Sequence, residues 1–144
     1  MNVNISRALV AGMVGTAVMT VVGLYLAPMM GMPPMNPAEM LAGAMGGSTM
    51  LGWLSHFMIG VVLAAGYAVV GSVLPGPAIV RGALYGIGPF LLAQIAVMPM
   101  MGMPIFSGSV TLAMGSLVGH LIYGGVVGGI YGADEVAKTA SATA

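Results

Sequence analysis

The hexapeptide PMMGMP occurs twice in this chain of 144 residues, at residues 28–33 and again at residues 99–104. Each copy ends one long apolar segment and precedes another. Because a hexapeptide of this composition is not expected to recur by chance at equivalent places in so short a chain, we interpret the two copies as the mark of an internal duplication. The sequence therefore predicts two helical hairpins, each of which turns at a methionine-rich bend.

The composition indicates that lipid, rather than water, surrounds most of the chain. Hydrophobic residues make up 59% of the sequence and charged residues only 4%, whereas about 25% of the residues in a soluble domain are charged. Three Lys or Arg residues are too few to bind a nucleic acid backbone, which requires several cationic contacts. The sequence contains no cysteine, which excludes disulfides, thiolate metal sites and cysteine nucleophiles.

Four apolar segments are long enough to cross a hydrocarbon core of roughly 30 Å as helices. We expect them at about residues 5–28, 50–74, 79–98 and 109–132. The predicted fold is all-α: an integral membrane four-helix bundle built from two tandem helical hairpins, which form a parallel internal repeat.

The hairpins and the ends of the chain can be placed more closely. We expect a single four-span domain at residues 1–138, with repeat 1 at about residues 5–74, repeat 2 at about 79–132 and a disordered tail at 139–144. In the first bend, Asn36 can cap a helix whose first residue is Pro37. This pattern predicts a short interfacial helix over residues 37–45.

Corresponding positions of the two halves follow from their spacing. Arg7 and Gly12 are spaced like Arg81 and Gly86, and on this register Thr20 corresponds to Gln94. The second span of each hairpin repeats another pattern: His56, Gly60 and Tyr67 in the first, His120, Gly124 and Tyr131 in the second. Offsets of four and seven residues place each set of three on one helix face.

The few charges predict the orientation. Under a four-span topology Arg7, Arg81 and Lys138 lie on one side of the membrane, whereas both bends lack Lys and Arg. By the positive-inside rule, both termini are then cytoplasmic and both bends face outward. We expect a multi-pass protein of the inner, or plasma, membrane.

Two histidines define the candidate polar site within the membrane. If Tyr67 marks the inner interface, His56 lies about 16 Å away, near the midplane, and His120 lies at a similar depth by the repeat. The two imidazoles could form a proton-sensitive pair or ligate a metal, although we do not expect haem. Alternatively, each forms hydrogen bonds across the bundle. The candidate partners are Thr20, Gln94, Ser55, Ser116 and backbone carbonyls.

Methionine is abundant, with 16 residues in the chain, and it gathers at the bends. Thioethers are soft ligands that select Cu(I), but methionine is also a flexible apolar residue that fills irregular gaps. Both interpretations stay open. The candidate metal ligands are Met29, Met30, Met32, Met100, Met101 and Met103.

Small residues on the histidine faces predict close helix packing, at Gly60 in the second span and at Gly124 and Gly128 in the fourth. A neighbouring face of the fourth span carries Gly125 and Gly129. We therefore expect contacts with two neighbours, one of which could belong to another copy of the chain or to a larger membrane complex.

No catalytic constellation emerges from the sequence, so we do not expect an enzyme. Ser55 and His56 are consecutive helix residues that point about 100° apart, and no carboxylate is placed to orient them. The leading hypothesis is a structural or accessory membrane subunit. The alternative is a small transporter or channel for a proton or for Cu(I).

Three stretches, LGWLSHFMIG, RGALYGIGPFLLAQIAVMPMMGM and GHLIYGGVVGGIYG, carry a resemblance to a known family. They resemble an uncharacterised family of small four-span bacterial membrane proteins, known as a domain of unknown function. The resemblance covers about residues 40–132 and implies a bacterial inner-membrane protein, without an activity or a ligand. Its specific residues are His56, Phe57, Gly60, Arg81, Gly82, Met98, Pro99, His120, Tyr123 and Gly124.

Overall fold

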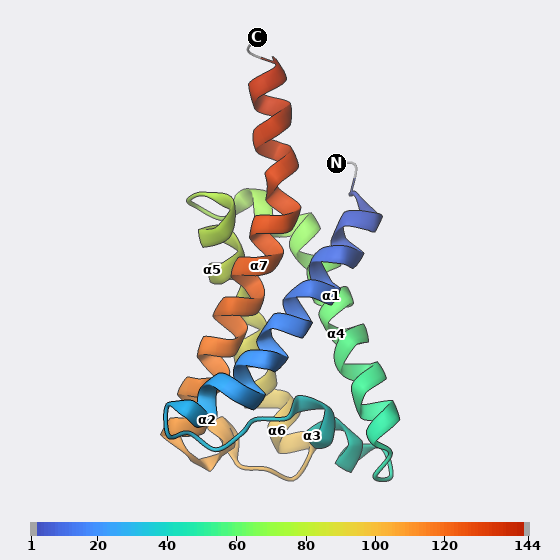
Figure 1. Ribbon diagram of the computed structural model, residues 1–144, viewed down its shortest axis with the longest axis vertical. Helices are drawn as coiled ribbons and strands as arrows, with labels where there is room; N and C mark the ends of the chain where they lie inside the picture. Colours follow the sequence, from blue (N-terminus) through green and yellow to red (C-terminus); the bar gives the residue numbers. More distant parts are fainter. Residues whose placement is uncertain (1–2, 143–144) are drawn as a thin grey trace.

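The structure is a computed structural model that describes residues 3–142, with side chains described as far as residue 132. This part of the chain is helical and contains no strand. Four helical segments are long and apolar enough to cross a membrane: Ile5–Met29, Thr49–Val73, Ala78–Met100 and Val110–Gly132. Figure 1 shows them side by side, with both termini at one end and both bends at the other. The predicted all-α four-helix bundle is confirmed.

The first span is not a uniform α-helix. It consists of α1 (Ile5–Val21), a π-helix η1 (Val22–Leu26) and a short α2 (Ala27–Met29). Asn4 caps its start, because the Asn4 side chain accepts a hydrogen bond from the backbone N–H of Arg7.

The third span has the same construction, with α5 (Ala78–Leu92), a π-helix η3 (Ala93–Val97) and a short α6 (Met98–Met100). In both spans the residue before the proline of PMMGMP donates its N–H five residues back, from Ala27 to Val22 and from Met98 to Ala93. A proline ring clashes with the carbonyl four residues earlier in an α-helix, and the wider π turn relieves this clash. The sequence did not predict these π-helices, which occupy equivalent positions in the two hairpins.

The first bend contains α3 (Pro37–Ala44), as predicted. The Asn36 side chain accepts hydrogen bonds from the backbone N–H groups of Ala38 and Glu39. The helix ends before Gly46, which has a positive φ of 67°, a conformation that glycine adopts without steric strain.

The remaining elements complete the two hairpins. The second span is α4 (Thr49–Val70), followed by the 3₁₀ turn η2 (Gly71–Val73). The second bend forms the 3₁₀ turn η4 (Ile105–Gly108), and the fourth span begins α7 (Val110–Ala142). Residues 139–142, predicted to be disordered, continue this helix; the rest of that predicted tail, residues 143–144, lies outside the described residues.

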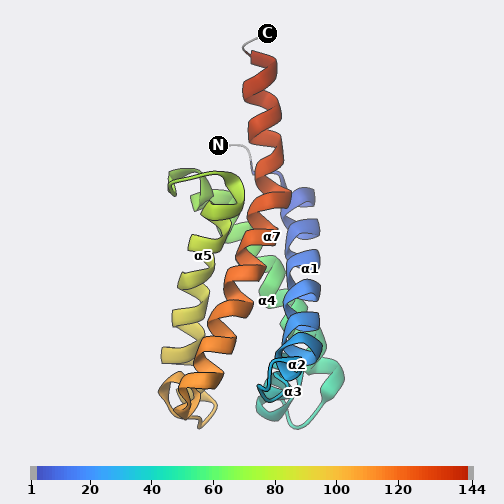
Figure 2. The same cartoon turned by 60° about the vertical axis from the view of Figure 1, so that its left-hand side comes forward.

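The helices do not close evenly around the bundle axis. Helix α7 lies between α5 and α1 and packs against both (Figure 2), and α1 also packs against α4. By contrast, α4 makes little contact with α5. The bundle is therefore asymmetric although its two hairpins have the same construction.

Close glycine contacts hold the helices together. A Cβ atom added at Gly82 of α5 would overlap the backbone of Gly124 in α7, and one added at Gly60 of α4 would overlap Thr16 of α1. Gly128 is equally close to Ala78. These positions include the three glycines for which the sequence predicted helix packing.

The second glycine face of α7, for which another copy of the chain was one possible neighbour, lies against a helix of the same chain. Gly125 and Gly129 both lie against Ile79 of α5, so this face also packs within the same chain. The spacing alone could not show this, because α5 is close enough to α7 to cover both glycine rows.

Tyrosines fill the half of the bundle near the termini. Tyr67 and Tyr123 are buried there with Val127 and Ala64. The Tyr67 hydroxyl donates to the carbonyl of Ala78 at 3.3 Å. Its ring therefore lies in the core of the bundle, and the depth of Tyr67 in the membrane, from which the depth of the histidines was reckoned, stays a prediction.

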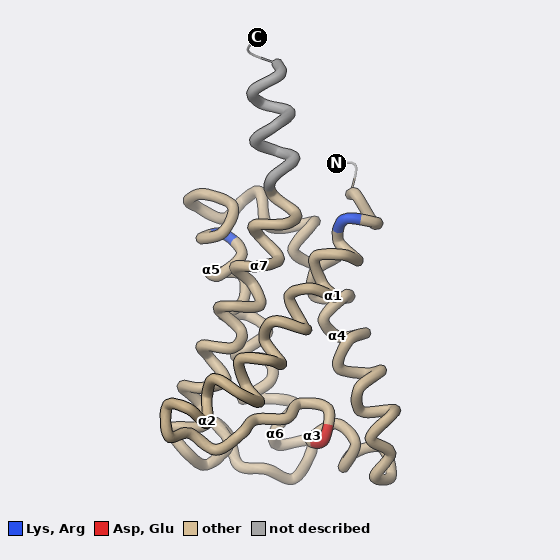
Figure 3. Tube along the Cα trace, in the orientation of Figure 1, with Lys and Arg blue, Asp and Glu red and all other residues tan. Residues whose placement is uncertain are grey.

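The described charges lie at the two ends of the bundle. Arg7 and Arg81 are both at the end that carries the termini, and Glu39 is at the bend end (Figure 3). The Arg7 side chain donates to the carbonyl of Ile130 at 2.6 Å, which ties the start of α1 to α7. Lys138, the third charge behind the predicted orientation, lies outside the residues whose side chains are described.

Candidate functional site: a cavity between the two hairpins

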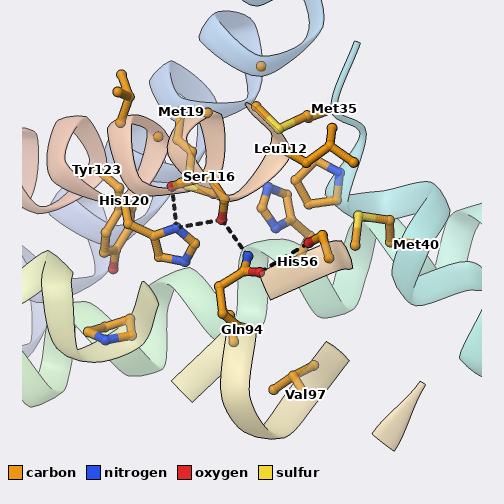
Figure 4. Close-up of a pocket in the computed structure, with 18 of the residues that line it drawn as sticks. Met19, Met35, Met40, His56, Gln94, Val97, Leu112, Ser116, His120 and Tyr123 are labelled. Atoms are coloured by element: carbon orange, nitrogen blue, oxygen red, sulfur yellow. Dashed lines mark hydrogen bonds between the residues drawn. The ribbon is translucent and has the colours of Figure 1, made fainter. Parts of the chain in front are cut away.

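A cavity of about 280 Å³ lies in the half of the bundle next to the bends. All four spans and both bends contribute to its wall, and Figure 4 shows the side chains around it. Most of the lining is apolar, with several methionines such as Met19, Met35 and Met40. The polar lining residues are Thr16, His56, Gln94, Ser107, Ser116, His120 and Tyr123.

The two π-helices form part of this wall. Val22 and Gly23 of η1 line the cavity on one side, and Ala93, Gln94 and Val97 of η3 line it on the other. A π turn is wider than an α turn and is frequent at functional sites. The π turns that precede the two prolines therefore widen the first and the third span at the level of the cavity.

His56 is fixed by a hydrogen bond to α1. Its Nε2 atom lies 3.0 Å from Thr20 Oγ1, and the Thr20 hydroxyl donates to the carbonyl of Thr16 at 2.7 Å. A hydroxyl has one hydrogen, and Thr20 uses it on Thr16. Nε2 of His56 must therefore be the donor to Thr20, which leaves a lone pair on Nδ1 of the neutral ring.

His120 is fixed by its own helix. Its Nδ1 atom lies 2.8 Å from the backbone carbonyl of Ser116 and 3.5 Å from the Ser116 hydroxyl. A carbonyl can only accept, so Nδ1 carries the hydrogen and Nε2 has the lone pair in the neutral ring. The two rings thus use opposite nitrogens for the protein, and each keeps one nitrogen as an acceptor.

Gln94 connects three elements at the edge of the cavity. The side chain, only 1% exposed, donates to Ser116 Oγ of α7 and accepts from Ser107 Oγ of the second bend, each at 3.0 Å. Ser107 and Phe106 both have positive φ, at 59° and 54°. Non-glycine residues rarely adopt this conformation, and here it directs the Ser107 hydroxyl towards Gln94.

The structure brings together the four residues predicted as the polar site, although not as a symmetric set. Thr20 bonds His56 directly, whereas Gln94 reaches Ser116 and not His120. Ser55, another predicted partner, donates to the sulfur of Met45 instead. The sequence did not predict Thr16, Ser107 or Tyr123 as part of the site. The four-residue spacing of Thr16 and Thr20 is the one signal that could have indicated the first of these.

The six predicted methionine ligands divide into two groups. Met30, Met32, Met101 and Met103 line the cavity. Met29 and Met100 are 82% and 86% exposed and do not line it. Within residues 3–132, no group of three or more His, Cys, Asp or Glu side chains is arranged to hold a metal ion.

These features define a helical membrane protein of four spans with an internal cavity. The chain belongs to a family of unknown function, DUF6789, which it matches over residues 2–141. No curated protein and no solved structure matches it.

Proposed function

We propose that this protein is a non-enzymatic membrane protein that binds a small, mainly apolar molecule in the cavity between its hairpins. The cavity itself is the observation that carries this proposal. A volume of about 280 Å³ is close to the lower end of small-molecule sites, which are concave, mostly apolar and fitted with a few polar groups.

The weak contact between α4 and α5 supports entry from the bilayer. Ile59 on α4 and Leu92 on α5 both line the cavity, and their side chains are 46% and 59% exposed. They lie on the two helices that make little contact with each other. An apolar molecule dissolved in the membrane can therefore reach the cavity without crossing the polar interface.

The chemistry of the lining favours binding over catalysis. The side chains that the structure places around the cavity include no Asp, Glu, Lys or Arg. General acid–base or nucleophilic catalysis requires a base within hydrogen-bonding reach and, in a triad, a third group that orients it. The ring nitrogens next to the Thr20 and Ser116 hydroxyls both carry a hydrogen, so neither imidazole is placed as a base towards these hydroxyls.

A pair of glycine-to-leucine variants tests the proposal. Gly119 lines the cavity, and a Cβ atom added there would lie 3.5 Å from Met19 Cγ, an ordinary contact, so Gly119→Leu fills the space. Gly88 has nothing within 4 Å of its added Cβ and does not line the cavity, so Gly88→Leu is the matched control.

The measurement is saturable binding of 4-propylanisole to protein in lipid nanodiscs, followed by the fluorescence of the single tryptophan, Trp53, whose ring centroid is 6.4 Å from that of His56. We expect binding to the wild type and to Gly88→Leu, and none to Gly119→Leu. A linear, non-saturable response of the wild type would overturn the proposal.

In the cell, we propose that the protein acts in the bacterial inner membrane with both termini in the cytoplasm, as an accessory subunit associated with itself or with a larger membrane complex. Support for the orientation comes from Arg7 and Arg81 at one end of the bundle (Figure 3). Single cysteines at Glu39 and Ser72, both exposed and at opposite ends, test it with a membrane-impermeant thiol reagent. If only the cysteine at position 72 were labelled in intact cells, the termini would lie outside the cell, and the proposed orientation would be wrong.

A second candidate is transport of a soft cation such as Cu(I). The observation in its favour is that thioethers of both bends, including Met32 and Met103, line the same cavity as His56 and His120. Equilibrium dialysis with Cu(I) under reducing conditions tests this candidate. The variant for comparison changes both MMGM segments to LLGL, at Met29, Met30, Met32, Met100, Met101 and Met103. Equal binding by wild type and variant would exclude the thioethers as ligands.

A further inference from the structure

We infer that the molecule bound in the cavity carries a hydrogen-bond donor at one end, and that it belongs to the class of apolar alcohols and phenols. This inference rests on the proposed function, because it names the ligand chemistry of the same cavity. Its basis is the direction of the hydrogen bonds made by His56 and His120, each of which presents an acceptor nitrogen rather than a donor.

The protein already uses the N–H group of each neutral imidazole. His56 donates from Nε2 to Thr20, and His120 donates from Nδ1 to the Ser116 carbonyl. The nitrogens that remain, Nδ1 of His56 and Nε2 of His120, have no hydrogen-bond partner among the described residues. Each therefore has a lone pair that the protein leaves unused.

These two nitrogens are reachable from the cavity. Thr16 Oγ1 is the one fully enclosed polar side-chain atom without a partner in the part of the chain whose side chains are described. The unused imidazole nitrogens are therefore not sealed in the protein, and both rings line the cavity (Figure 4). An unpaired polar atom facing an apolar space is unfavourable, and a ligand that donates a hydrogen bond removes this cost.

The other polar lining groups select a hydroxyl over a carbonyl. The Tyr123 hydroxyl donates to the carbonyl of Gly60, and the Ser107 hydroxyl donates to Gln94. An acceptor-only molecule, such as an ester or a ketone, can accept from the second N–H of Gln94 but leaves both imidazole lone pairs without a donor. A hydroxyl can donate to an imidazole nitrogen and also accept from the second N–H of Gln94, which has one N–H engaged with Ser116.

The size and charge of the cavity separate this class from ions. A volume of about 280 Å³ is roughly nine times the share of one water molecule in the liquid, about 30 Å³, so it accommodates a molecule rather than a bare metal ion. A carboxylate or phosphate would require a cationic partner, and the lining residues described above include no Lys or Arg. A neutral headgroup with an apolar body fits both observations.

The test compares two probes that differ in one hydrogen-bond donor, 4-propylphenol and 4-propylanisole. Both are measured in nanodiscs at matched concentrations in the bilayer, through Trp53 fluorescence. We expect the phenol to bind about five- to tenfold more tightly, the effect of one hydrogen bond. Equal affinity for the two probes would overturn the inference while leaving the proposed function intact. Saturable binding of neither probe would overturn both.

Variants assign the preference to the imidazoles. The double variant His56→Phe/His120→Phe keeps the ring shapes and removes both lone pairs, so we expect it to bind phenol and anisole equally. The control is Tyr85→Phe, because Tyr85 lies outside the cavity lining and donates to Leu63 O at 2.8 Å. It should retain the preference for the phenol. A preference that survives in the double variant would contradict the role of the histidines.

A measurement on the wild type keeps the inference testable if the double variant does not fold. The chain contains two histidines, so uniform ¹⁵N-histidine labelling gives two ring systems in solid-state NMR. We expect one ring protonated at Nε2 and the other at Nδ1, and a shift of at least one unprotonated nitrogen with 4-propylphenol but not with 4-propylanisole. Two rings of the same tautomer, or identical responses to both probes, would contradict the assignment.

Discussion

The helices pack differently at the two ends of the bundle, near the termini and near the bends. Near the termini, Gly82 and Gly124 bring α5 and α7 into backbone contact, and Tyr67 and Val127 fill the space between the other helices. Near the bends the same four spans surround a cavity. Tyr123 lies at the boundary, since it belongs to the buried core and also lines the cavity.

The difference shows that the cavity is not the result of generally loose packing. Lipid provides no hydrophobic driving force between membrane helices, so close contact of small residues stabilises the half near the termini, which we call the closed half. Once that half fixes the helix positions, the π-helices η1 and η3 widen the half near the bends, which we call the open half. A closed half that holds an open half in place is suited to a preformed site, which a ligand can enter with little reorganisation.

The largest effect is expected where the closed half is broken. Gly82→Leu places a side chain against the backbone of Gly124, which cannot move away as the end of a side chain can. Overpacking of this kind costs about 3 kcal/mol, so we expect most of the folded protein to be lost. The measurement is unfolding in SDS, followed by circular dichroism.

Gly88→Leu in the same helix is the control for this change. A Cβ atom added at this exposed position meets nothing within 4 Å, so stability should stay within about 0.5 kcal/mol of the wild type. Similar losses for both variants would show that the contact with Gly124 does not determine stability.

The next effect concerns the edge of the open half. Gln94→Leu leaves the hydroxyls of Ser107 and Ser116 without their shared partner, and we expect a loss of about 2 kcal/mol. Ser107→Ala removes one of these bonds and should cost about 1 kcal/mol. SDS unfolding of both variants measures the difference; a Gln94→Leu protein as stable as wild type would show that this network does not hold the second bend.

A smaller effect is expected at the boundary between the halves. Tyr123→Phe removes the hydrogen bond from α7 to the carbonyl of Gly60 in α4, which should cost about 1 kcal/mol. Tyr25→Phe, at a ring that is exposed on the first span, is the control and should have no effect in the same unfolding experiment. Equal stability of the two variants would show that the hydrogen bond of Tyr123 does not stabilise the contact between the hairpins.

The closed half was largely predictable from the sequence, and the open half was predictable only in part. Small residues at four-residue spacing indicate close packing whatever the partner helix is, which is why Gly124 and Gly128 lie in contacts of the closed half and Gly60 lies in a contact at the edge of the cavity. The spacing of His56 and His120 also indicated one shared site, and both rings line one cavity. Periodicity alone carries this much information, because it depends only on the α-helical repeat.

The cavity depends on features without such periodicity. The prolines at 28 and 99 predicted bends, but the π-helices before them depend on how the preceding turn accommodates each proline ring. The positive φ of Ser107, a non-glycine residue, has no signal in the sequence. Helix α1 packs against both α4 and α7, whereas its counterpart α5 packs against α7 and makes little contact with α4. The repeat alone would predict the same pattern of contacts for both helices, so this asymmetry is also a tertiary effect.

The smallest effect on stability is expected where the open half is filled. At Gly119 an added Cβ atom meets only Met19, at 3.5 Å, and the rest of a leucine side chain extends into the cavity. We therefore expect Gly119→Leu to change the free energy of unfolding by less than about 1 kcal/mol, in contrast to the same change at Gly82. Since filled space no longer admits a ligand, binding of 4-propylanisole should disappear in this folded variant. A loss of stability as large as that of Gly82→Leu would mean that there is no space for the side chain beside Gly119, and the contrast between the closed and the open half would not hold.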